Sequence, residues 1–234
     1  MQIVSAPGPS SGGPGTTPPA GSTAAALARR TLRGAPVVLA SRNRGKLVEF
    51  DALCAGILNL EAWPPDVPVP EVLEDGATFL DNALVKARTF ALACGSTALA
   101  DDSGLEVDAL GGAPGVRSAR YGGAGLDDRA RSSLLLEALA GVENRRARFR
   151  CVVVLHAARP GDAWFSAAGT LEGAIGCAPR GAAGFGYDPV FVPEGCGGRT
   201  LAELAPATKN AISHRALALR ALLDMLRAAR EGGR

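Results

Sequence analysis

From residue 37 onward, apolar and polar stretches alternate in a way that predicts a strand, a loop and a helix. Residues 37–40 form a short apolar run, and residues 41–45 form a polar loop. The apolar positions that follow recur at helical spacing and are expected to form one buried stripe. They are Leu47, Phe50, Leu53, Cys54, Ile57 and Leu58. Residues 63–70 are rich in proline and predict an irregular segment.

A second helix is marked at both ends. Thr78 is a suitable N-cap, and Gly95 is expected to end the helix. Residues 97–100 then predict a strand that runs into an acidic loop over residues 101–104. The predicted buried side of the helix consists of Phe79, Leu80, Ala83, Leu84, Ala87, Phe90 and Ala91.

The second half of the chain adds a hairpin to this alternation. A helix is predicted over residues 127–140, and the β-prone runs 149–157 and 164–175 flank a Pro-Gly-Asp turn signal at 160–162. Ser213 is a candidate N-cap for a final helix that carries Leu217, Leu222, Leu223 and Leu226. Helices that alternate with strands, together with a hairpin, predict an α/β fold with a mixed central sheet.

Residues 1–34 have a different composition from the rest. They are rich in Pro, Gly, Ser, Thr and Ala, which are residues that bury little apolar surface. We therefore expect a flexible N-terminal extension over 1–34 and a folded domain over 35–234.

Composition excludes several classes of protein. The net charge of +2 and an aromatic content of 5% give no broad surface for nucleic acid. No apolar run approaches the roughly 20 residues that cross a bilayer, so we expect no membrane partner. The five cysteines are odd in number and none has CxxC spacing, which argues against a disulfide framework or a zinc site. A reducing, cytoplasmic setting is the expectation.

The segment Ser41-Arg42-Asn43-Arg44-Gly45-Lys46 joins a predicted strand to a predicted helix. Helix N-termini offer free N–H groups and partial positive charge, and Arg44 and Lys46 add full charges. A phosphate-binding loop is therefore one interpretation, although the GxxxxGK[ST] pattern is absent. A solvated turn with basic residues is the alternative.

Acidic side chains form the second candidate site. Asp101 and Asp102 follow a predicted strand, and Glu74 lies in a loop just before a helix. Carboxylates suit Mg²⁺, which one or two of them hold together with substrate phosphates. Because neighbouring side chains on extended backbone point in opposite directions, one of the two aspartates is expected to face the site. A capped acidic turn is the alternative.

Basic and aromatic residues complete the candidates. Asn82 and Lys86 share a helix face, so Lys86 could reach a phosphate or could be a solvated lysine. The loop Gly184-Phe185-Gly186-Tyr187-Asp188-Pro189 could stack a ring on a nucleobase or could place its aromatics in the core. Anion or base recognition is a possible role for a last group, Lys209, His214 and Arg215. No nucleophile elbow accompanies either histidine, which argues against a serine hydrolase.

These motifs together resemble the non-canonical purine NTP pyrophosphatases, also called inosine or xanthosine triphosphate pyrophosphatases, of the Ham1-like family. The resemblance runs from about residue 37 to residue 226. Four blocks in order carry it: 41–46; 74–79 with Asn82 and Ala83; 100–105 continuing through 111–115 to 118–121; and 184–189 followed by 213–215. Ser41 stands where the family often has Thr, and Asp81 stands where Glu is usual.

The resemblance implies a fold, an activity and a set of roles. The fold would have two lobes around a long mixed sheet, with a nucleotide-binding cleft between them, and the protein would be a homodimer. It would hydrolyse ITP, dITP and XTP to the monophosphate and pyrophosphate, with Mg²⁺ as cofactor. Glu74 and Asp102 would bind the metal, and Asp102 would also accept a proton. Substrate would be bound by Ser41, Arg42, Asn43, Arg44, Gly45, Lys46, Ser103, Phe185, Gly186, Tyr187, Asp188, Lys209, His214 and Arg215.

Two rival functions stay open at this point. One is a Maf-like pyrophosphatase that acts on pyrimidine or other modified nucleotides. The other is a regulator that binds a nucleotide without hydrolysing it, which the carboxylates Glu74 and Asp102 argue against.

Overall fold

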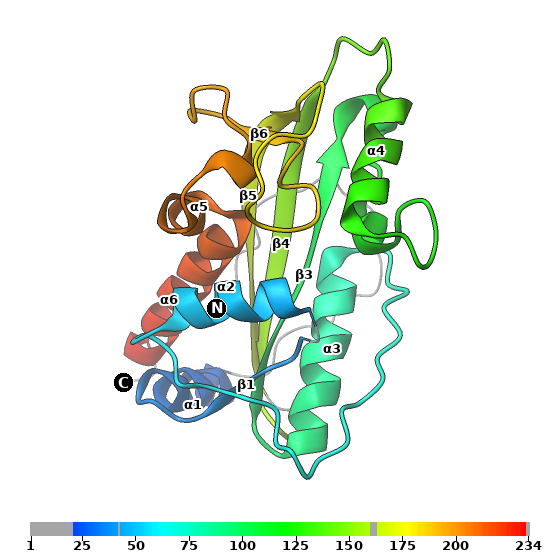
Figure 1. The fold of residues 1–234 in the computed structure, drawn as a ribbon. Coiled ribbons are helices and arrows are strands. Elements are labelled where there is room, and N and C mark those ends of the chain that lie inside the picture. The colour runs from blue at the N-terminus through cyan, green and yellow to red at the C-terminus, as the bar shows by residue number, and fades with distance from the viewer. Residues whose placement is uncertain (1–20, 42, 160–162, 233–234) are drawn as a thin grey trace. The chain divides into compact units, whose positions relative to one another are not determined.

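The computed structural model describes residues 21–41, 43–159 and 163–232 (Figure 1). Within these ranges the chain forms two compact units. Unit 1 consists of residues 21–102, 152–168 and 218–232, and unit 2 of residues 103–151 and 169–217. Each unit has its own apolar core and is described by itself below.

Six strands form one mixed sheet in the order β2-β1-β3-β4-β5-β6. Strand β1 pairs in parallel with β2 and β3, whereas β5 and β6 are antiparallel. Helices accompany this sheet, so the predicted α/β class with a mixed sheet is confirmed. The strands are β1 (Val37–Leu39), β2 (Leu60–Glu61), β3 (Thr97–Val107), β4 (Arg146–His156), β5 (Trp164–Ile175) and β6 (Phe191–Pro193).

The predicted hairpin is confirmed as β4 and β5. At one end the Ala157 N–H donates to the carbonyl of Ala163 at 3.1 Å, and at the other the Ile175 N–H donates to the carbonyl of Arg145 at 2.9 Å. These bonds join the end of β4 to the start of β5 and the start of β4 to the end of β5, as in an antiparallel pair. The predicted turn at 160–162 lies outside the described residues.

Unit 1 contains helices α1 (Gly21–Leu32), α2 (Arg44–Cys54) and α3 (Phe79–Cys94), and most of α6 (His214–Glu231). Helix α3 begins and ends as predicted. Thr78 and Asp81 form a reciprocal capping box, and Gly95 ends the helix in the left-handed conformation at φ 66°. The apolar side of α3 packs against β3, β4 and Ala40, which follows β1, through small residues and Phe90. This packing turns Asn82 and Lys86 into the protein, where both are buried.

Unit 2 is built around a separate core that includes Leu105, Leu135, Phe149, Tyr187 and Phe191. Its helices are α4 (Asp128–Ala138) and α5 (Pro206–Ile212), with 3₁₀ turns η1 (Asp108–Leu110), η2 (Gly115–Arg120) and η3 (Leu201–Glu203). Asp127 caps α4 through the Ala130 N–H. Ser213 accepts the Ala216 N–H at 3.1 Å, which confirms it as the cap of the last helix.

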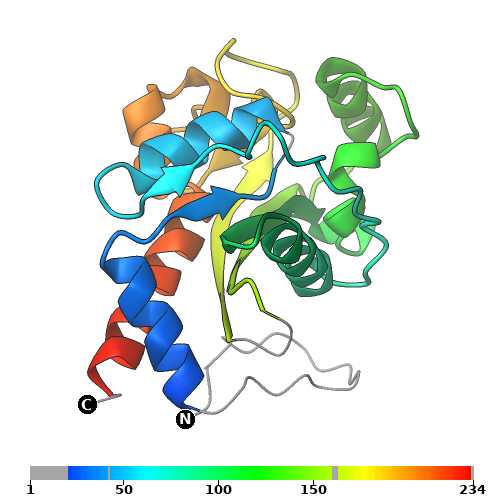
Figure 2. The same ribbon diagram turned by 90° about the horizontal axis from the view of Figure 1, so that it is seen from below.

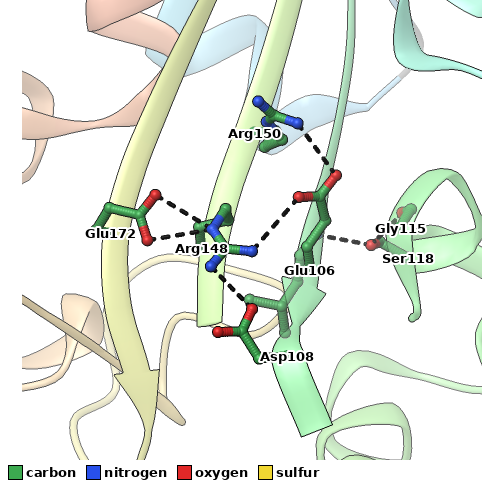
Figure 3. Close-up of polar contacts among 8 residues, drawn as sticks. Glu106, Asp108, Gly115, Ser118, Arg148, Arg150 and Glu172 are labelled. Carbon is green, nitrogen blue, oxygen red and sulfur yellow. Dashed lines mark hydrogen bonds and ion pairs between the residues drawn. The ribbon is translucent and has the colours of Figure 1, made fainter. Parts of the chain in front are cut away.

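Charged side chains on β3, β4 and β5 of unit 2, with Asp108 of η1, form a group that we name the Arg148 cluster (Figure 3). Its members are Glu106, Asp108, Arg148, Arg150 and Glu172. The Arg148 guanidinium contacts Asp108 at 2.8 Å, both Glu172 oxygens at 3.2 Å and Glu106 at 3.9 Å. Arg150 also contacts Glu106, at 3.8 Å. The cluster therefore ties β4 to the strand on each side of it.

The structure corrects three expectations about local structure. Residues 101–104 are not a loop, because β3 continues through them to Val107. Helix α2 ends at Cys54, so Ile57 and Leu58 lie beyond it. Residues 21–32 form α1, which the composition of the segment concealed.

Helix α1 is part of unit 1 and runs beside the C-terminal part of α6 in both views (Figures 1 and 2). Ala25, Leu27, Ala28 and Thr31 are buried, so the folded part begins before residue 35. The alanines of this segment pack closely and favour a helix, which outweighs the flanking Pro and Gly residues. Residues 1–20 lie outside the described residues, and their expected flexibility stays a prediction.

Two further features bear on the class of protein. None of the helices in the described ranges is long and apolar enough to cross a membrane. All five cysteines are free thiols in the structure. Burial, with a smaller contribution from Asp51, raises the pKa of the Cys54 thiol to about 12, so this cysteine is a neutral core residue.

Candidate functional site

The predicted phosphate loop joins β1 to α2 in unit 1. Its polar side chains organise the start of the helix: Ser41 Oγ accepts the Asn43 N–H at 3.2 Å, and Asn43 Oδ1 accepts the Lys46 N–H at 3.1 Å. The Lys46 ammonium lies 2.8 Å from the Asp101 carboxylate, which is fully buried. Arg42 and the side chain of Arg44 lie outside what the structure describes. The loop therefore presents a helix N-terminus and a lysine directed at β3.

Asp101 and Asp102 have different partners, as expected for neighbours on a strand. Asp101 binds Lys46, whereas Asp102 Oδ2 accepts a hydrogen bond from Asn82 Nδ2 at 2.9 Å. Asn82 also uses its Oδ1 to accept the Gly76 N–H at 2.8 Å. A Cβ at Gly76 would come within 2.7 Å of that Oδ1, so a glycine is needed for this close approach. One amide thus connects the loop after Glu74 to Asp102.

Lys86 lies between the same loop and β3. Its ammonium is 2.7 Å from Glu74 Oε2 and donates to the Asp101 carbonyl at 3.0 Å. The side chain is 11% exposed, so the alternative of a solvated lysine is wrong. We name these residues of unit 1 the Asp102 cluster: Lys46, Glu74, Asn82, Lys86, Asp101 and Asp102.

The electrostatics of the cluster make Asp102 a stronger base than an ordinary aspartate. Burial raises the pKa of the Asp102 carboxyl, and the negative charge of Asp101 raises it further. The hydrogen bond from Asn82 and the charges of Lys46 and Lys86 oppose this increase without cancelling it. A carboxylate with a raised pKa is suited to accepting a proton from a bound water.

The donor set of the cluster fits a hard divalent cation that also binds substrate. Glu74 and Asp102 offer carboxylate oxygens, and Glu74 is 38% exposed and already has a cation, Lys86, against it. Among the described residues, no group of three or more His, Cys, Asp or Glu side chains forms a metal cage. Mg²⁺ does not need one, because it is usually held by one or two carboxylates and substrate phosphates.

In unit 2, Asp188 organises the predicted aromatic loop. Its buried carboxylate accepts the Phe185 N–H at 2.8 Å and lies 2.7 Å from the Lys209 ammonium, which is also buried. Gly184 has φ 79°, and a Cβ there would collide with the Asp188 carboxylate. The loop is therefore closed around one acidic side chain.

The two aromatic residues of this loop have different surroundings. Tyr187 is a core residue whose hydroxyl donates to the Ser118 carbonyl at 3.0 Å, and burial raises its pKa. The alternative of a core aromatic thus holds for Tyr187. Phe185 is only half-buried, and the Lys209 ammonium and the Arg215 guanidinium lie 5.0 Å and 5.1 Å from its ring centre. Phe185 is the ring of the two that could stack on a base.

His214 and Arg215 form the first turn of α6 and are buried. Arg215 donates to the Ser103 hydroxyl at 3.1 Å, which brings two of the predicted substrate ligands together. The His214 ring stacks on Phe149 with 4.7 Å between ring centres. Lys209, from α5, and Arg215 both lie against the Phe185 ring. We name Ser103, Phe185, Asp188, Lys209, His214 and Arg215 the Phe185 cluster of unit 2.

The structure thus gathers part of the predicted set into two clusters, one in each unit. Ser41 and Asn43 instead bond to backbone at the start of α2, and Tyr187 belongs to the core of unit 2. Two supporting contacts were not recognised from the sequence. Asp128 accepts the Gly186 N–H at 2.7 Å, and the Phe149 ring supports His214. In the sequence, Asp128 has the features of a residue at a helix start and Phe149 those of a strand residue. Neither position indicated a contact with a candidate site residue.

Comparisons with known proteins show which family this chain is similar to. The model of the Ham1 family matches residues 37–225. A dITP/XTP pyrophosphatase of Anaeromyxobacter sp. (strain Fw109-5) is 46% identical over 227 residues, which cover 84% of this chain and 99% of that protein. A solved HAM1 protein from Coxiella burnetii is 43% identical with a TM-score of 0.72, over 84% of this chain and 99% of that chain. The Staphylococcus aureus Ham1 protein has a TM-score of 0.73 at 37% identity, over 82% of this chain and 98% of its own.

The family match spans the strand that precedes the phosphate loop, both clusters and most of the last helix. The relatives are covered over almost their whole length, so the similarity is not confined to one motif. This chain belongs to the Ham1 family.

Proposed function

We propose that this protein hydrolyses non-canonical purine nucleoside triphosphates, such as dITP, XTP and ITP, to the monophosphate and pyrophosphate. Such an enzyme would remove these nucleotides from the pool. Membership of the Ham1 family and the name of its relatives, dITP/XTP pyrophosphatase, support the reaction and the substrate class. The observation that carries the proposal is the buried Asp102 carboxylate, which one amide and two lysines surround.

Asp102 is the proposed general base. It would accept a proton from the water whose oxygen attacks the α-phosphorus. As the new P–O bond forms, the bond from the α-phosphorus to the bridging oxygen breaks, and pyrophosphate leaves with the electron pair. Asn82 fixes the orientation of the carboxylate by its bond to Oδ2.

Glu74 and Asp102 are the proposed ligands of Mg²⁺. When bound, this ion supplies positive charge that offsets the charge building up on the phosphate oxygens. Lys46, Lys86 and the N–H groups at the start of α2 would stabilise the departing pyrophosphate. The exposed fraction of Glu74 leaves its carboxylate accessible from solvent.

The Phe185 cluster is the proposed site for the base. Phe185 would stack on the purine, and Lys209, His214 and Arg215 offer donors that suit a 6-oxo group. Adenine presents an amino group at that position, so donors would be left unsatisfied when adenine binds. Asp188 is already bonded to Lys209 and the Phe185 N–H, which supports a role in shaping this loop.

A second copy of the chain is the partner that we propose, since the family resemblance implies a homodimer. Sedimentation equilibrium of the full chain measures this state directly. A monomer at all concentrations would contradict the proposal.

A pyrophosphate-release assay on a panel of nucleotides tests the function. We expect release from dITP, XTP and ITP that far exceeds release from dATP, dTTP and UTP, and that is lost when a chelator removes Mg²⁺. Preferred release from dTTP or UTP would instead identify a Maf-like pyrophosphatase. Tight binding of ITP without release would identify a nucleotide-binding regulator.

A further inference from the structure

The chain uses lysine at very few positions. Of its 25 lysines and arginines, only Lys46, Lys86 and Lys209 are lysines. Each makes an ion pair with a carboxylate of the two clusters, at 2.8 Å, 2.7 Å and 2.7 Å respectively. Each side chain is also at most 14% exposed. Lysine is therefore confined to the candidate site, and the rest of the basic side chains are arginines.

Lys86 differs from the other two in the carboxylate that it contacts. Lys46 and Lys209 pair with Asp101 and Asp188, whose side chains are almost completely buried. The carboxylate that pairs with Lys86 belongs to Glu74, which is 38% exposed and is a proposed Mg²⁺ ligand. The second contact of Lys86 is a backbone carbonyl, that of Asp101.

These contacts put the Lys86 ammonium among oxygen ligands of the kind that a hard divalent cation prefers. One carboxylate oxygen cannot be fully bonded to an ammonium and to a metal ion at the same time, because the two cations repel each other. A lysine can move away, since its compact charge sits on a flexible stem with three rotatable donors. The bond to the Asp101 carbonyl would keep the released ammonium nearby.

We propose that Lys86 and a divalent metal ion compete for the Glu74 carboxylate, so that metal binding releases the Lys86 ammonium for the triphosphate. The inference rests on the proposed function, in which Glu74 holds Mg²⁺ and Lys86 contacts phosphate. It adds a coupling between the two events. The enzyme offers its phosphate-binding lysine when the metal is bound, and neutralises Glu74 with the same lysine when it is not.

The binding of Mn²⁺ to the full chain, followed by electron paramagnetic resonance, tests the competition. Replacing Lys86 by Met keeps an unbranched stem of nearly the same length and removes the competing charge. We expect Lys86→Met to bind Mn²⁺ roughly fivefold more tightly than the wild type, as removal of one partly exposed ion pair would allow.

Lys46→Met is the matched control. Both lysines act on Asp102 through their charge, so both variants remove a similar general repulsion of the metal. Of these two lysines, Lys86 is paired with Glu74 and Lys46 with Asp101. We expect Lys46→Met to tighten Mn²⁺ binding by at most about twofold. Equal tightening in both variants, or unchanged or weaker binding in Lys86→Met, would overturn the proposal.

A measurement on the unchanged protein covers the case in which Lys86→Met fails to fold. Lysine labelled with ¹³C at Cε gives three signals, which single Lys→Arg variants assign. Titration with Mg²⁺ should move the Lys86 signal most, the Lys46 signal less and the Lys209 signal least. A Lys86 signal that stays in place while Mg²⁺ is added overturns the competition.

Pyrophosphate release measured on the same samples separates this inference from the proposed function. Mg²⁺-dependent release from dITP or XTP with an immobile Lys86 signal would leave the function in place and remove the coupling. A protein that releases no pyrophosphate, but in which Mg²⁺ moves the Lys86 signal, would retain the competition and lose the function.

Discussion

Two carboxyls of strand β3, the buried Asp102 in unit 1 and the half-buried Glu106 in unit 2, are balanced by different cations. Burial raises the pKa of both carboxyls. At Asp102 the opposing charges are lysine ammoniums, those of Lys46 and Lys86. Arginines oppose the shift at Glu106. Lysine ammoniums therefore offset the negative charge at Asp102, and arginine guanidiniums offset it at Glu106.

In the Arg148 cluster, one arginine contacts several carboxylates at once. Arg148 contacts Asp108, Glu172 and Glu106 through different nitrogens of one planar group (Figure 3). Its partial burial lowers the pKa of Arg148, but the hydrogen bonds that it donates to Asp108 and Glu172 outweigh this and raise the pKa. A guanidinium held by several carboxylates is fixed in orientation, because each contact constrains the others.

The lysines of the Asp102 cluster are charges that can change partners. Lys46 and Lys86 are each paired with one carboxylate. An ammonium is a compact charge, so its ion pair depends less on side-chain orientation than that of a planar guanidinium does. The difference suggests that the Arg148 cluster fastens strands together, whereas the Asp102 cluster is suited to accepting a ligand. Four experiments can break or sharpen this comparison.

The largest difference is expected in catalysis. Replacing Asp102 with Asn keeps the shape of the side chain but removes the base. We expect kcat for dITP to fall by roughly a hundredfold or more, as loss of a general base typically does. Steady-state kinetics of pyrophosphate release measure the change.

Glu106→Gln is the control on the same strand. It also replaces a carboxyl of raised pKa by an amide, but this half-buried residue belongs to the Arg148 cluster. We expect kcat close to that of the wild type. If Asp102→Asn turned over dITP as fast as Glu106→Gln, Asp102 would not be the general base.

The second difference is expected in stability. Removal of the guanidinium in Arg148→Met leaves three carboxylates close together, and we expect the free energy of unfolding to fall by about 2 kcal/mol. Arg148→Lys keeps the charge but lacks the planar guanidinium that bonds several carboxylates at once. Its free energy of unfolding should fall by about half as much. Urea unfolding followed by circular dichroism gives both values. Equal stability of the Lys and Arg proteins would show that geometry adds nothing to charge.

The sequence predicted features that depend on neighbouring residues. Thr78 and Gly95 bound α3 because a cap and a left-handed glycine act within one turn of the helix. The length of β3 was not predictable in this way. Residues 101–104 resembled a polar loop, but they belong to the strand. There Asp101 pairs with Lys46 of α2, and Ser103 accepts a hydrogen bond from Arg215, and both partners are remote in the sequence.

The candidate site shows the same limit. Its residue types could be selected from the sequence and from the family resemblance, but their partners could not. That Asn82 connects the Gly76 N–H to Asp102 depends on how α3 packs against the sheet. Likewise, the sequence offered two aromatic rings in one loop, and only tertiary packing decides that Tyr187 enters the core while Phe185 stays half-buried.

The third difference is expected in the pH dependence of kcat/KM. Asp102 must be ionised to accept a proton, and the charge of Lys46 lowers its pKa. Lys46→Met should therefore raise the pKa of Asp102 further. The acidic limb of the profile should therefore move to higher pH. Arg150→Met removes a cation that acts on Glu106 instead, and should leave the limb in place. A limb that moves equally in both variants would contradict the separation of the clusters.

The smallest effect is expected at the edge of the Arg148 cluster. Glu172 is 41% exposed, so water competes with its two bonds to Arg148 Nε. We expect Glu172→Gln to lower the free energy of unfolding by at most about 0.5 kcal/mol, in the range of exposed ion pairs, and the loss should shrink further in high salt. Asp108 at 2.8 Å would still hold the guanidinium. If Glu172→Gln instead lowered the free energy of unfolding as much as Arg148→Met, the loss of one ion pair would be as damaging as the loss of the whole guanidinium. The contrast with the single contacts of the lysines would then disappear.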